Sequence, residues 1–197
     1  MIKRLFDIIF SFFGLIVVSL PMLIIALLIK KESPGPAFYC GERVGKDGKI
    51  FRIFKFRSMV LNAEKIGGPS TSADDPRLLK IGKFLRKYQL DELPQFINIL
   101  KGEMSFVGPR PEVPSEVEIY DAETKKIILS VKPGLTDLAT LENVHEEEIL
   151  RGANDPHEAY RKLIQPKKLK LAKEYVKNRS FWLDIKIILK TIKSAIF

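Results

Sequence analysis

Residues 90–111, LDELPQFINILKGEMSFVGPRP, decide how the rest of this chain is interpreted. Asp91 and Glu92 directly precede apolar residues that recur with the spacing of one helix face: Leu93, Phe96, Ile97 and Leu100. The pattern predicts a helix with Asp91 as its N-cap, Pro94 in its first turn and Gly102 at its end. Both carboxylates would then lie at the positive end of a helix dipole, where free backbone N–H groups favour a bound phosphate.

Arg110 stands between two prolines, Pro109 and Pro111. A proline fixes its own backbone and pushes the preceding residue into an extended conformation, so Arg110 is predicted to be held rigidly. A rigid guanidinium suits bidentate contact with a phosphate. Taken alone, an acidic pair before an apolar stripe is typical of an ordinary helix start. The phosphate interpretation therefore depends on the whole segment.

The composition limits the class of protein and of partner. A chain of 197 residues has room for one domain with a core, and an apolar content of 46% excludes global disorder. The net charge of +9 indicates an anionic partner: nucleic acid, anionic lipid or a phosphorylated substrate. Cys40 is the only cysteine, which excludes an internal disulfide, and His145 and His157 are too few for a histidine metal cluster.

The N-terminal region contains an uncharged apolar run from residue 8 to residue 29, interrupted by Pro21. A straight helix of this length would measure about 33 Å, enough to cross a bilayer, and a cleaved signal peptide fits poorly. Basic residues flank both ends, so the positive-inside rule gives no direction: Lys3, Arg4, Lys30 and Lys31. We therefore expect a helix bent at Pro21 that enters and leaves by one membrane face, with Ser19 bonding a freed carbonyl.

The rest of the chain predicts an α+β domain that is mostly helical. Residues 37–59 are typical of a β-hairpin with its turn at 45–48, and residues 67–72 of a flexible loop that acts as a lid. Further helices are expected at residues 74–88, 112–132 and 166–175 and after Asp155. The tail, residues 181–197, has a basic edge and an apolar face with Trp182. It is equally consistent with an interfacial membrane helix and with a core helix.

Aromatic and basic residues alternate along the second arm of the hairpin, as Phe54, Lys55, Phe56 and Arg57. Such alternation is typical of a platform on which nucleic-acid bases stack. It is equally typical of an amphipathic strand beside a membrane. The residues of this arm alone leave both interpretations open.

Residues 90–111 resemble the signature of the bacterial sugar transferase family, the monotopic polyprenyl-phosphate phosphoglycosyl transferases. The matching positions are Leu90-Asp91-Glu92-Leu93-Pro94-Gln95, Asn98, Leu100-Lys101-Gly102, Met104-Ser105 and Gly108-Pro109-Arg110-Pro111. The hairpin arm around Lys55 and Arg57, the position of Arg86 and residues 133–136 are similar to the same family. After residue 136 the sequence departs from the family pattern. The usual Asn-Gly-Arg turn is missing, Arg151 is a weak substitute, and an acidic run follows at residues 146–148.

The resemblance implies that residues 1–32 form a re-entrant membrane helix. It also implies that residues 33–197 form a catalytic domain with amphipathic interface helices, which lies on the cytoplasmic face of the bacterial inner membrane. The implied reaction moves a phosphosugar from a UDP-sugar to polyprenyl (undecaprenyl) phosphate and releases UMP. This is the first membrane step in assembling a glycoconjugate such as capsule, O-antigen or exopolysaccharide. The implied partners are the UDP-sugar, polyprenyl phosphate and anionic lipids, with a homodimer as one option for assembly.

The resemblance also assigns roles to residues. Asp91 is expected to be the nucleophile of an aspartyl-phosphosugar intermediate, because carboxylates form acyl phosphates. Glu92 is expected to bind Mg²⁺. The remaining candidates are expected to bind substrate phosphates: Arg86, Arg110, Lys55 and Arg57. The divergence at residues 137–151 leaves the sugar open.

Two alternatives to covalent catalysis stay open. One is a direct transfer in a ternary complex, with both carboxylates on a metal ion. The other is a non-catalytic basic scaffold bound to the membrane. Nucleic acid is not expected as a partner, because an acidic pair among apolar positions would repel its phosphates.

Overall fold

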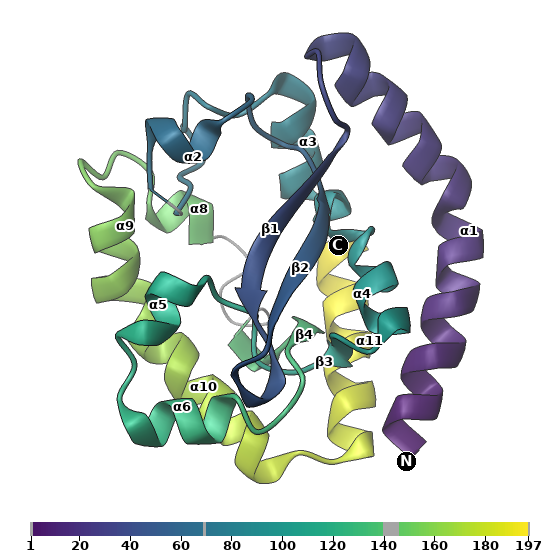
Figure 1. Cartoon of the computed structure of the whole chain (residues 1–197), viewed down its shortest axis with the longest axis vertical. Helices are drawn as coiled ribbons and strands as arrows, with labels where there is room; N and C mark the ends of the chain where they lie inside the picture. Colours follow the sequence, from purple (N-terminus) through teal and green to yellow (C-terminus); the bar gives the residue numbers. More distant parts are fainter. Residues whose placement is uncertain (1, 69, 140–145, 197) are drawn as a thin grey trace.

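The computed structural model describes residues 2–68, 70–139 and 146–196. In chain order its elements are α1 (Ile2–Glu32), β1 (Phe38–Val44), η1 (Lys46–Gly48), β2 (Ile50–Phe56), α2 (Ala63–Ile66), α3 (Lys80–Lys87), η2 (Leu90–Glu92), α4 (Gln95–Lys101), β3 (Ser105–Val107), α5 (Pro114–Glu118), α6 (Ala122–Ile128), β4 (Gly134–Thr136), α8 (Glu146–Ile149), α9 (Pro156–Ala159), η3 (Tyr160–Ile164), α10 (Gln165–Asn178) and α11 (Phe181–Ile196). The hairpin of β1 and β2 lies at the centre, with α4, α11 and then α1 on one side and α2, α5, α6, α9 and α10 on the other (Figure 1). The mostly helical α+β class is confirmed.

The hairpin forms where the sequence predicts it. β1 and β2 pair antiparallel, with Phe38 opposite Phe56 at the open end. The turn uses Asp47 and Gly48, whose φ angles of 57° and 76° lie in the left-handed region that glycine and aspartate tolerate best. Turn chemistry and strand alternation are local properties, which is why the sequence alone locates this element.

The C-terminal third of α1 belongs to the hydrophobic core. It contributes two buried side chains to a cluster of five: Ile25, Ile29, Phe56, Leu79 and Leu85. Beyond them, the Glu32 carboxylate accepts hydrogen bonds from the backbone N–H groups of Lys80 (2.6 Å) and Ile81 (2.9 Å). Because these are unpaired donors at a helix start, Glu32 fixes the end of α1 to the beginning of α3.

The N-terminal turn of α1 is also bonded to the domain. Lys3 donates to the carbonyl oxygen of Val107 (3.0 Å) and forms an ion pair with Asp184 of α11. Arg4 donates to two carbonyl oxygens in the last turn of α4, at 2.6 and 2.9 Å. Carbonyl oxygens in the last turn of a helix carry partial negative charge, so a cation stabilises them. Both ends of α1 therefore contact the same domain.

Between its ends, α1 is long and apolar enough to cross a membrane, and most of its apolar side chains are exposed. The helix is continuous through Pro21 and curves along the domain without a sharp kink (Figure 1). Pro21 deprives the carbonyl of Val17 of its usual donor. Ser19 does not replace that donor, because its hydroxyl donates to the carbonyl oxygen of Ile16 (2.7 Å).

Two predicted helix boundaries are wrong for local reasons. α3 begins at Lys80 and not at residue 74, because the Asp75 carboxylate accepts hydrogen bonds from the backbone and the guanidinium of Arg77 (both 2.9 Å) and closes a turn. Residues 112–132 form two helices, because the Asp121 carboxylate accepts a hydrogen bond from the backbone N–H of Thr124 (2.7 Å) and caps α6.

The loop predicted as a flexible lid is held from inside by Arg77. Its guanidinium donates to the carbonyl oxygens of Gly68 (3.1 Å) and Ser70 (3.2 Å). The Ser70 hydroxyl lies 3.0 Å from Nδ1 of His157, whose Nε2 lies 3.1 Å from the buried Glu116 carboxylate. Hydrogen bonds thus connect Gly68 and Ser70 of this loop to Arg77 and to His157 of α9, and the role as a lid stays a prediction.

The tail helix α11 combines the two predicted alternatives. Ile187 is buried against Val107 and Tyr175, so one face is core. On the rest of the helix, large apolar side chains are exposed: Trp182, Leu189 and Ile192. This exposed part is available to a membrane interface.

β3 and β4 form a parallel pair that positions Arg110. A Cβ on Gly134 would lie 2.1 Å from the backbone nitrogen of Gly108, so the two backbones approach more closely here than any other residue would allow. The N–H of Gly134 also donates to the carbonyl oxygen of Pro109 (2.9 Å). The residue before Arg110 is therefore fixed to β4.

Candidate active site

Asp91 and Glu92 lie in η2, a single 3₁₀ turn, and the predicted N-cap at Asp91 is wrong. Helix α4 begins at Gln95, with Pro94 as its N-cap. The physical reason is that Pro94 would be the third residue of the predicted helix, where it lacks the N–H that a capping carboxylate binds. Asp91 is only 6% exposed and Glu92 only 9%. Buried charges require partners, which the neighbouring cations supply.

Glu92 holds two cations from distant parts of the chain. Nζ of Lys55, on β2, lies 2.7 Å from Oε1 of Glu92. Arg110 forms an ion pair with the same oxygen and lies 3.4 Å from Oε2. The buried amide of Asn98 fixes β2 beside the pair, since it accepts a hydrogen bond from the N–H of Phe54 (2.9 Å). Lys55 therefore reaches Glu92 from a strand that cannot shift freely.

Burial and these cations set the ionisation of the pair. Burial raises the pKa of Glu92, but Arg110 and Lys55 outweigh it and hold this pKa well below its usual range. Burial raises the pKa of Asp91 to about 6; Lys55 opposes the shift and the Glu92 charge adds to it. Burial also lowers the pKa of Lys55. Adjacent carboxyl groups whose pKa values are pushed apart are typical of a division of catalytic roles.

Asp91 is the less engaged of the two carboxylates. Among the described residues none donates a hydrogen bond to it, although Lys55, Arg86 and Arg110 all lower its pKa electrostatically. A carboxylate near cations but outside a hydrogen-bonded pair keeps its lone pairs available for bond formation. Asp91 is therefore suited to be a nucleophile, and Glu92 to hold the cations.

The other two predicted phosphate-binding residues have different surroundings. Arg86, at the end of α3, is close enough to Asp91 to lower its pKa, and its Nε donates to the carboxylate of Glu147 in α8. Arg57 donates to the carbonyl oxygens of Ser33 (2.6 Å) and Pro34 (2.8 Å). The linker after α1 therefore engages the Arg57 guanidinium, whereas Arg86 lies at the acidic pair.

Lys168 of α10 is a cation of this region that the sequence reasoning missed. The residue is 9% exposed; its Nζ lies 3.0 Å from Oε1 of Glu146 and 5.1 Å from the centroid of the Tyr160 ring. The chain around it is rich in lysine, which hides a single buried one. Helical spacing was the available signal, because Lys168 shares a face with the buried Leu171 and Tyr175.

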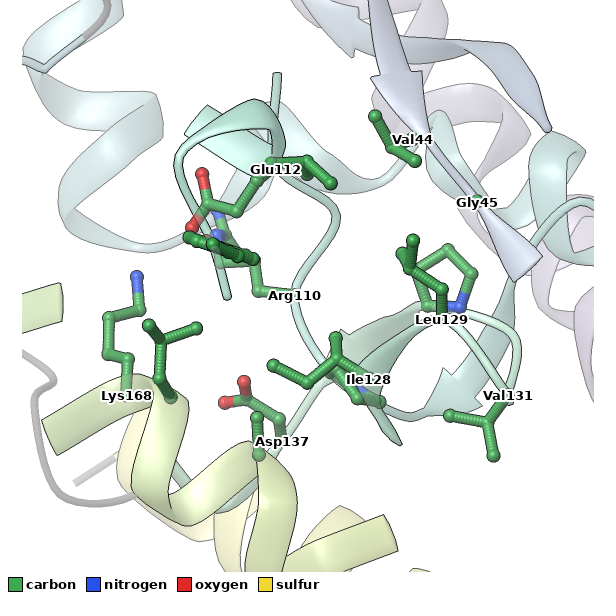
Figure 2. A pocket seen from close by; sticks show the side chains of 15 residues that line it. Val44, Gly45, Arg110, Glu112, Ile128, Leu129, Val131, Asp137 and Lys168 are labelled. Atoms are coloured by element: carbon green, nitrogen blue, oxygen red, sulfur yellow. The ribbon is translucent and has the colours of Figure 1, made fainter. Parts of the chain in front are cut away.

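A small cavity lies beside Arg110, and Figure 2 shows it with Asp137 and Lys168 on its polar side. Its apolar wall includes Val44, Ile128, Leu129 and Val131. The volume is about 40 Å³. That is room for on the order of three water molecules, whereas pockets for small-molecule ligands measure roughly 300–1,000 Å³. In this form of the protein the cavity is too small for a nucleotide.

The acidic pair could bind the Mg²⁺ expected from the resemblance only together with ligands from the substrate and from water. Within residues 2–68, 70–139 and 146–196, three or more His, Cys, Asp or Glu side chains nowhere form a metal cluster. Mg²⁺, however, needs only one or two carboxylates when phosphate oxygens and water complete its coordination. The ionised Glu92 already attracts cations, so its oxygens are suitable donors.

A buried acidic pair surrounded by cations, next to a helix of membrane-spanning length, has the charges that suit a phosphorylated substrate near a membrane. Residues 1–197 match the family model described as bacterial sugar transferase. The chain belongs to this family, as the motif in residues 90–111 predicts.

Three relatives show the breadth of the similarity. The UDP-N-acetylgalactosamine-undecaprenyl-phosphate N-acetylgalactosaminephosphotransferase of Aeromonas hydrophila is 38% identical over 99% of this chain and 44% of its own length. The UDP-glucose:undecaprenyl-phosphate glucose-1-phosphate transferase of Escherichia coli is 39% identical over 98% of this chain and 39% of its own. The undecaprenyl-phosphate galactose phosphotransferase of Salmonella typhimurium is 38% identical over 98% of this chain and 40% of its own length.

The chain spans less than half the length of these three relatives. Their names contain three different sugars at nearly equal identity to this chain. The similarity therefore does not select one sugar.

Proposed function

We propose that this protein transfers a phosphosugar from a UDP-sugar to undecaprenyl phosphate and releases UMP. The observation that carries the proposal is the buried pair in which Glu92 holds Lys55 and Arg110 while Asp91 accepts no hydrogen bond from any described residue. Family membership supports the acceptor and the donor class, since relatives are named for undecaprenyl phosphate and for UDP-sugars.

In the first step, the Asp91 carboxylate attacks the β-phosphorus of the donor. A bond forms between an Asp91 oxygen and this phosphorus, and the bond from the phosphorus to the oxygen bridging the two phosphates breaks. UMP leaves with that electron pair, and an aspartyl-phosphosugar remains. Arg110 and Lys55 stabilise the charge on the phosphate oxygens, and Glu92 keeps both cations in place.

In the second step, a phosphate oxygen of undecaprenyl phosphate attacks the same phosphorus. The bond to Asp91 breaks, the carboxylate is regenerated, and the undecaprenyl-diphosphosugar leaves. The covalent intermediate has a physical advantage. The water-soluble donor and the lipid acceptor occupy the site in turn and need not fit there together.

We propose Mg²⁺ as the cofactor, with Glu92 as its protein ligand. When bound, the ion would neutralise charge on the donor phosphates. Addition of a chelator should stop UMP release, and Mg²⁺ should restore it. Turnover that is independent of divalent cations would contradict the role given to Glu92.

We propose that the domain lies on the cytoplasmic face of the bacterial inner membrane and that α1 enters the membrane from that face. Its two ends are bonded to the domain, through Lys3 at one end and Glu32 at the other, and its exposed apolar residues lie between them. This arrangement keeps the basic residues at both ends on one side. Anionic lipids there attract each of them by about 1 kcal/mol.

The test of the covalent reaction uses purified protein and a panel of UDP-sugars without acceptor. One donor should leave a phosphosugar on Asp91, detected by mass spectrometry of the peptide, together with stoichiometric UMP. Asp91→Asn should form no adduct and show no turnover. Full activity of Asp91→Asn would overturn the assignment.

Two other outcomes would identify the alternative functions. UMP release that requires the acceptor and leaves no adduct would indicate direct transfer in a ternary complex. A complete lack of UMP release with every donor would indicate a non-catalytic scaffold.

A further inference from the structure

The short helix α8 places two carboxylates on two cations at the active site. Glu147 accepts a hydrogen bond from Nε of Arg86, and Oε1 of Glu146 lies 3.0 Å from Nζ of Lys168. Glu148, the third residue of the acidic run, pairs outside this group with the exposed Arg151 (2.8 Å). Only part of the acidic run therefore faces the site.

Of the two cations, Arg86 lies near the acidic pair and Lys168 shares a cavity with Arg110. Arg86 is close enough to Asp91 to lower its pKa. Lys168 lines the same cavity as Arg110, and the Glu146 charge raises the pKa of Arg110. Glu146 and Glu147 consequently occupy the electrostatic position that a bound anion would need.

We propose that Glu146 and Glu147 substitute for the donor diphosphate in the free protein. The UDP-sugar displaces α8 and takes over Arg86 and Lys168. Two carboxylates then exchange for the two negative charges of a diphosphate diester, so the charge at the cations is conserved. The inference rests on the proposed function for the identity of the donor, and it adds Lys168 to the residues that bind it.

The packing of α8 makes this displacement inexpensive. None of the four residues of α8 is buried, and the side chains of Glu146 and Glu147 are 27% and 34% exposed. Water reaches both carboxylates and weakens their ion pairs, although Lys168 itself is buried, and a four-residue helix has no stability of its own. Among the described residues, one backbone hydrogen bond connects α8 to a distant segment: the N–H of Ala73, in the loop before α3, donates to the carbonyl oxygen of Glu147 (3.0 Å).

The displacement also explains the size of the cavity beside Arg110. Its volume of about 40 Å³ is too small for a nucleotide, and the Lys168 side chain that lines it is held by Glu146. Removal of α8 frees that side chain. The donor site would then form on binding.

The first experiment measures the dissociation constant of UDP, which carries the diphosphate but no transferable sugar, by calorimetry. The Glu146→Gln/Glu147→Gln double variant should bind UDP about 3- to 30-fold more tightly than the original protein, because two weak competing pairs are lost. Glu148→Gln is the matched control: it removes one charge from the same helix and should leave the affinity unchanged. Unchanged or weaker UDP binding by the double variant would overturn the proposal.

A second measurement needs no variant. Hydrogen exchange of the backbone amides of α8 and of Ala73 should become faster when UDP is added, because the helix leaves its place. Slower exchange would mean that α8 closes over the ligand as a fixed wall, and the proposal would fail. Lys168→Met should weaken UDP binding by about tenfold.

The result is independent of whether the transfer reaction occurs. Tighter UDP binding by the double variant without any UMP release from UDP-sugars would support the role of α8 and contradict the proposed function. Normal UMP release from UDP-sugars, with a UDP affinity that the double variant leaves unaltered, would support the proposed function and contradict the role of α8. If both hold, the double variant should show a lower KM for the UDP-sugar.

Discussion

Asp91 and Glu92 are neighbours in the chain, but their charges are stabilised to opposite degrees. Glu92 has two cationic partners, Lys55 and Arg110, and a lowered pKa. Asp91 has burial without a hydrogen bond from the described residues, and its pKa is raised. The protein therefore stabilises one charge and tolerates the other. A buried carboxylate whose charge is poorly stabilised is typical of a reactive group.

Removal of each charge should change stability in opposite directions. The native state binds the Asp91 proton more tightly than the unfolded chain does, because the pKa of Asp91 is higher in the native state. The free energy of unfolding therefore falls as the pH rises above the unfolded pKa. The decrease is complete above about pH 6. Asp91→Asn should therefore raise the melting temperature at pH 7.5 by a few degrees. Glu92→Gln should lower stability by roughly 3 kcal/mol, since it leaves Lys55 and Arg110 unpaired. Thermal unfolding of the two variants in the same detergent checks both signs; a stabilised Glu92→Gln would contradict the ion-pair account.

The raised pKa of Asp91 also predicts the pH dependence of the reaction. The nucleophile must be ionised, so kcat/KM for UMP release should fall about tenfold per pH unit below about pH 6. Lys55→Met removes a charge that lowers this pKa and should move the acidic limb to higher pH. Lys126→Met, on the exposed side of α6, serves as the control and should leave the limb in place. A rate that is constant from pH 5 to pH 8 would exclude Asp91 as the titrating nucleophile.

Functional residues that lie in or beside a motif are predictable from the sequence, whereas those defined by long-range contact are not. Asp91, Glu92 and Arg110 stand in one segment, and the position of Arg86 relative to Asp91 is fixed by α3 and η2. Lys168 is more than 50 residues away and reaches the site only through packing of α10. The pairing of Glu146 and Glu147 with cations depends on tertiary structure in the same way, so the acidic run could only be described as a departure from the family pattern.

At the scale of the element, α3 shows how closely the acidic pair is supported. This helix carries Arg86 and leads directly into η2. Its start is capped by Glu32, and its middle rests on the backbone of Ser58 through the buried Gly82. A Cβ at Gly82 would lie 2.0 Å from the carbonyl oxygen of Ser58. The position of Arg86 thus depends on the absence of one methyl group.

Gly82→Ala should be destabilising, although alanine normally favours a helix over glycine by about 1 kcal/mol. The new methyl group must push α3 away from Ser58, at a cost of roughly 2 kcal/mol or more. KM for the UDP-sugar should rise as Arg86 moves with the helix. Lys83→Ala, at the next and exposed position, should leave both quantities unchanged. A more stable Gly82→Ala would show that the close approach to Ser58 does not exist in solution.

The elements themselves were predicted to the extent that their signals are local. The hairpin has an alternating pattern and a turn, and Gly102 ends α4 as expected, with a φ of 88°. The helix predicted over residues 112–132 failed although a local signal existed: Asp121 three residues before Thr124 is a capping arrangement. The start of α3 failed because the Asp75–Arg77 turn competes with helix formation, and helical periodicity does not report such a turn.

At the scale of the whole molecule, the main feature is an apolar helix attached to its domain at both ends. Lys3 and Arg4 bind β3, α11 and the end of α4, whereas Glu32 caps α3. A 31-residue helix is about 46 Å long. A straight crossing would need one of these two sets of contacts to break, so that Lys3 and the domain lie on opposite sides of the bilayer.

The location of the N-terminus tests this arrangement. Ile2 is 70% exposed, so Ile2→Cys in a Cys40→Ser background provides a single accessible thiol. If α1 enters and leaves by the cytoplasmic face, an impermeant thiol reagent should not label this cysteine in intact cells and should label it after the cells are opened. The matched control is Ser130→Cys in the same background, an exposed position after α6 that reports on the domain itself. Both sites should behave alike, because the contacts of Lys3 and Glu32 keep the N-terminus with the domain.

Labelling of Ile2→Cys in intact cells, with Ser130→Cys still protected, would mean that α1 crosses the membrane and that its contacts with β3, α4 and α11 do not exist there. Labelling of both would place the domain on the outer face, where the UDP-sugar is not available.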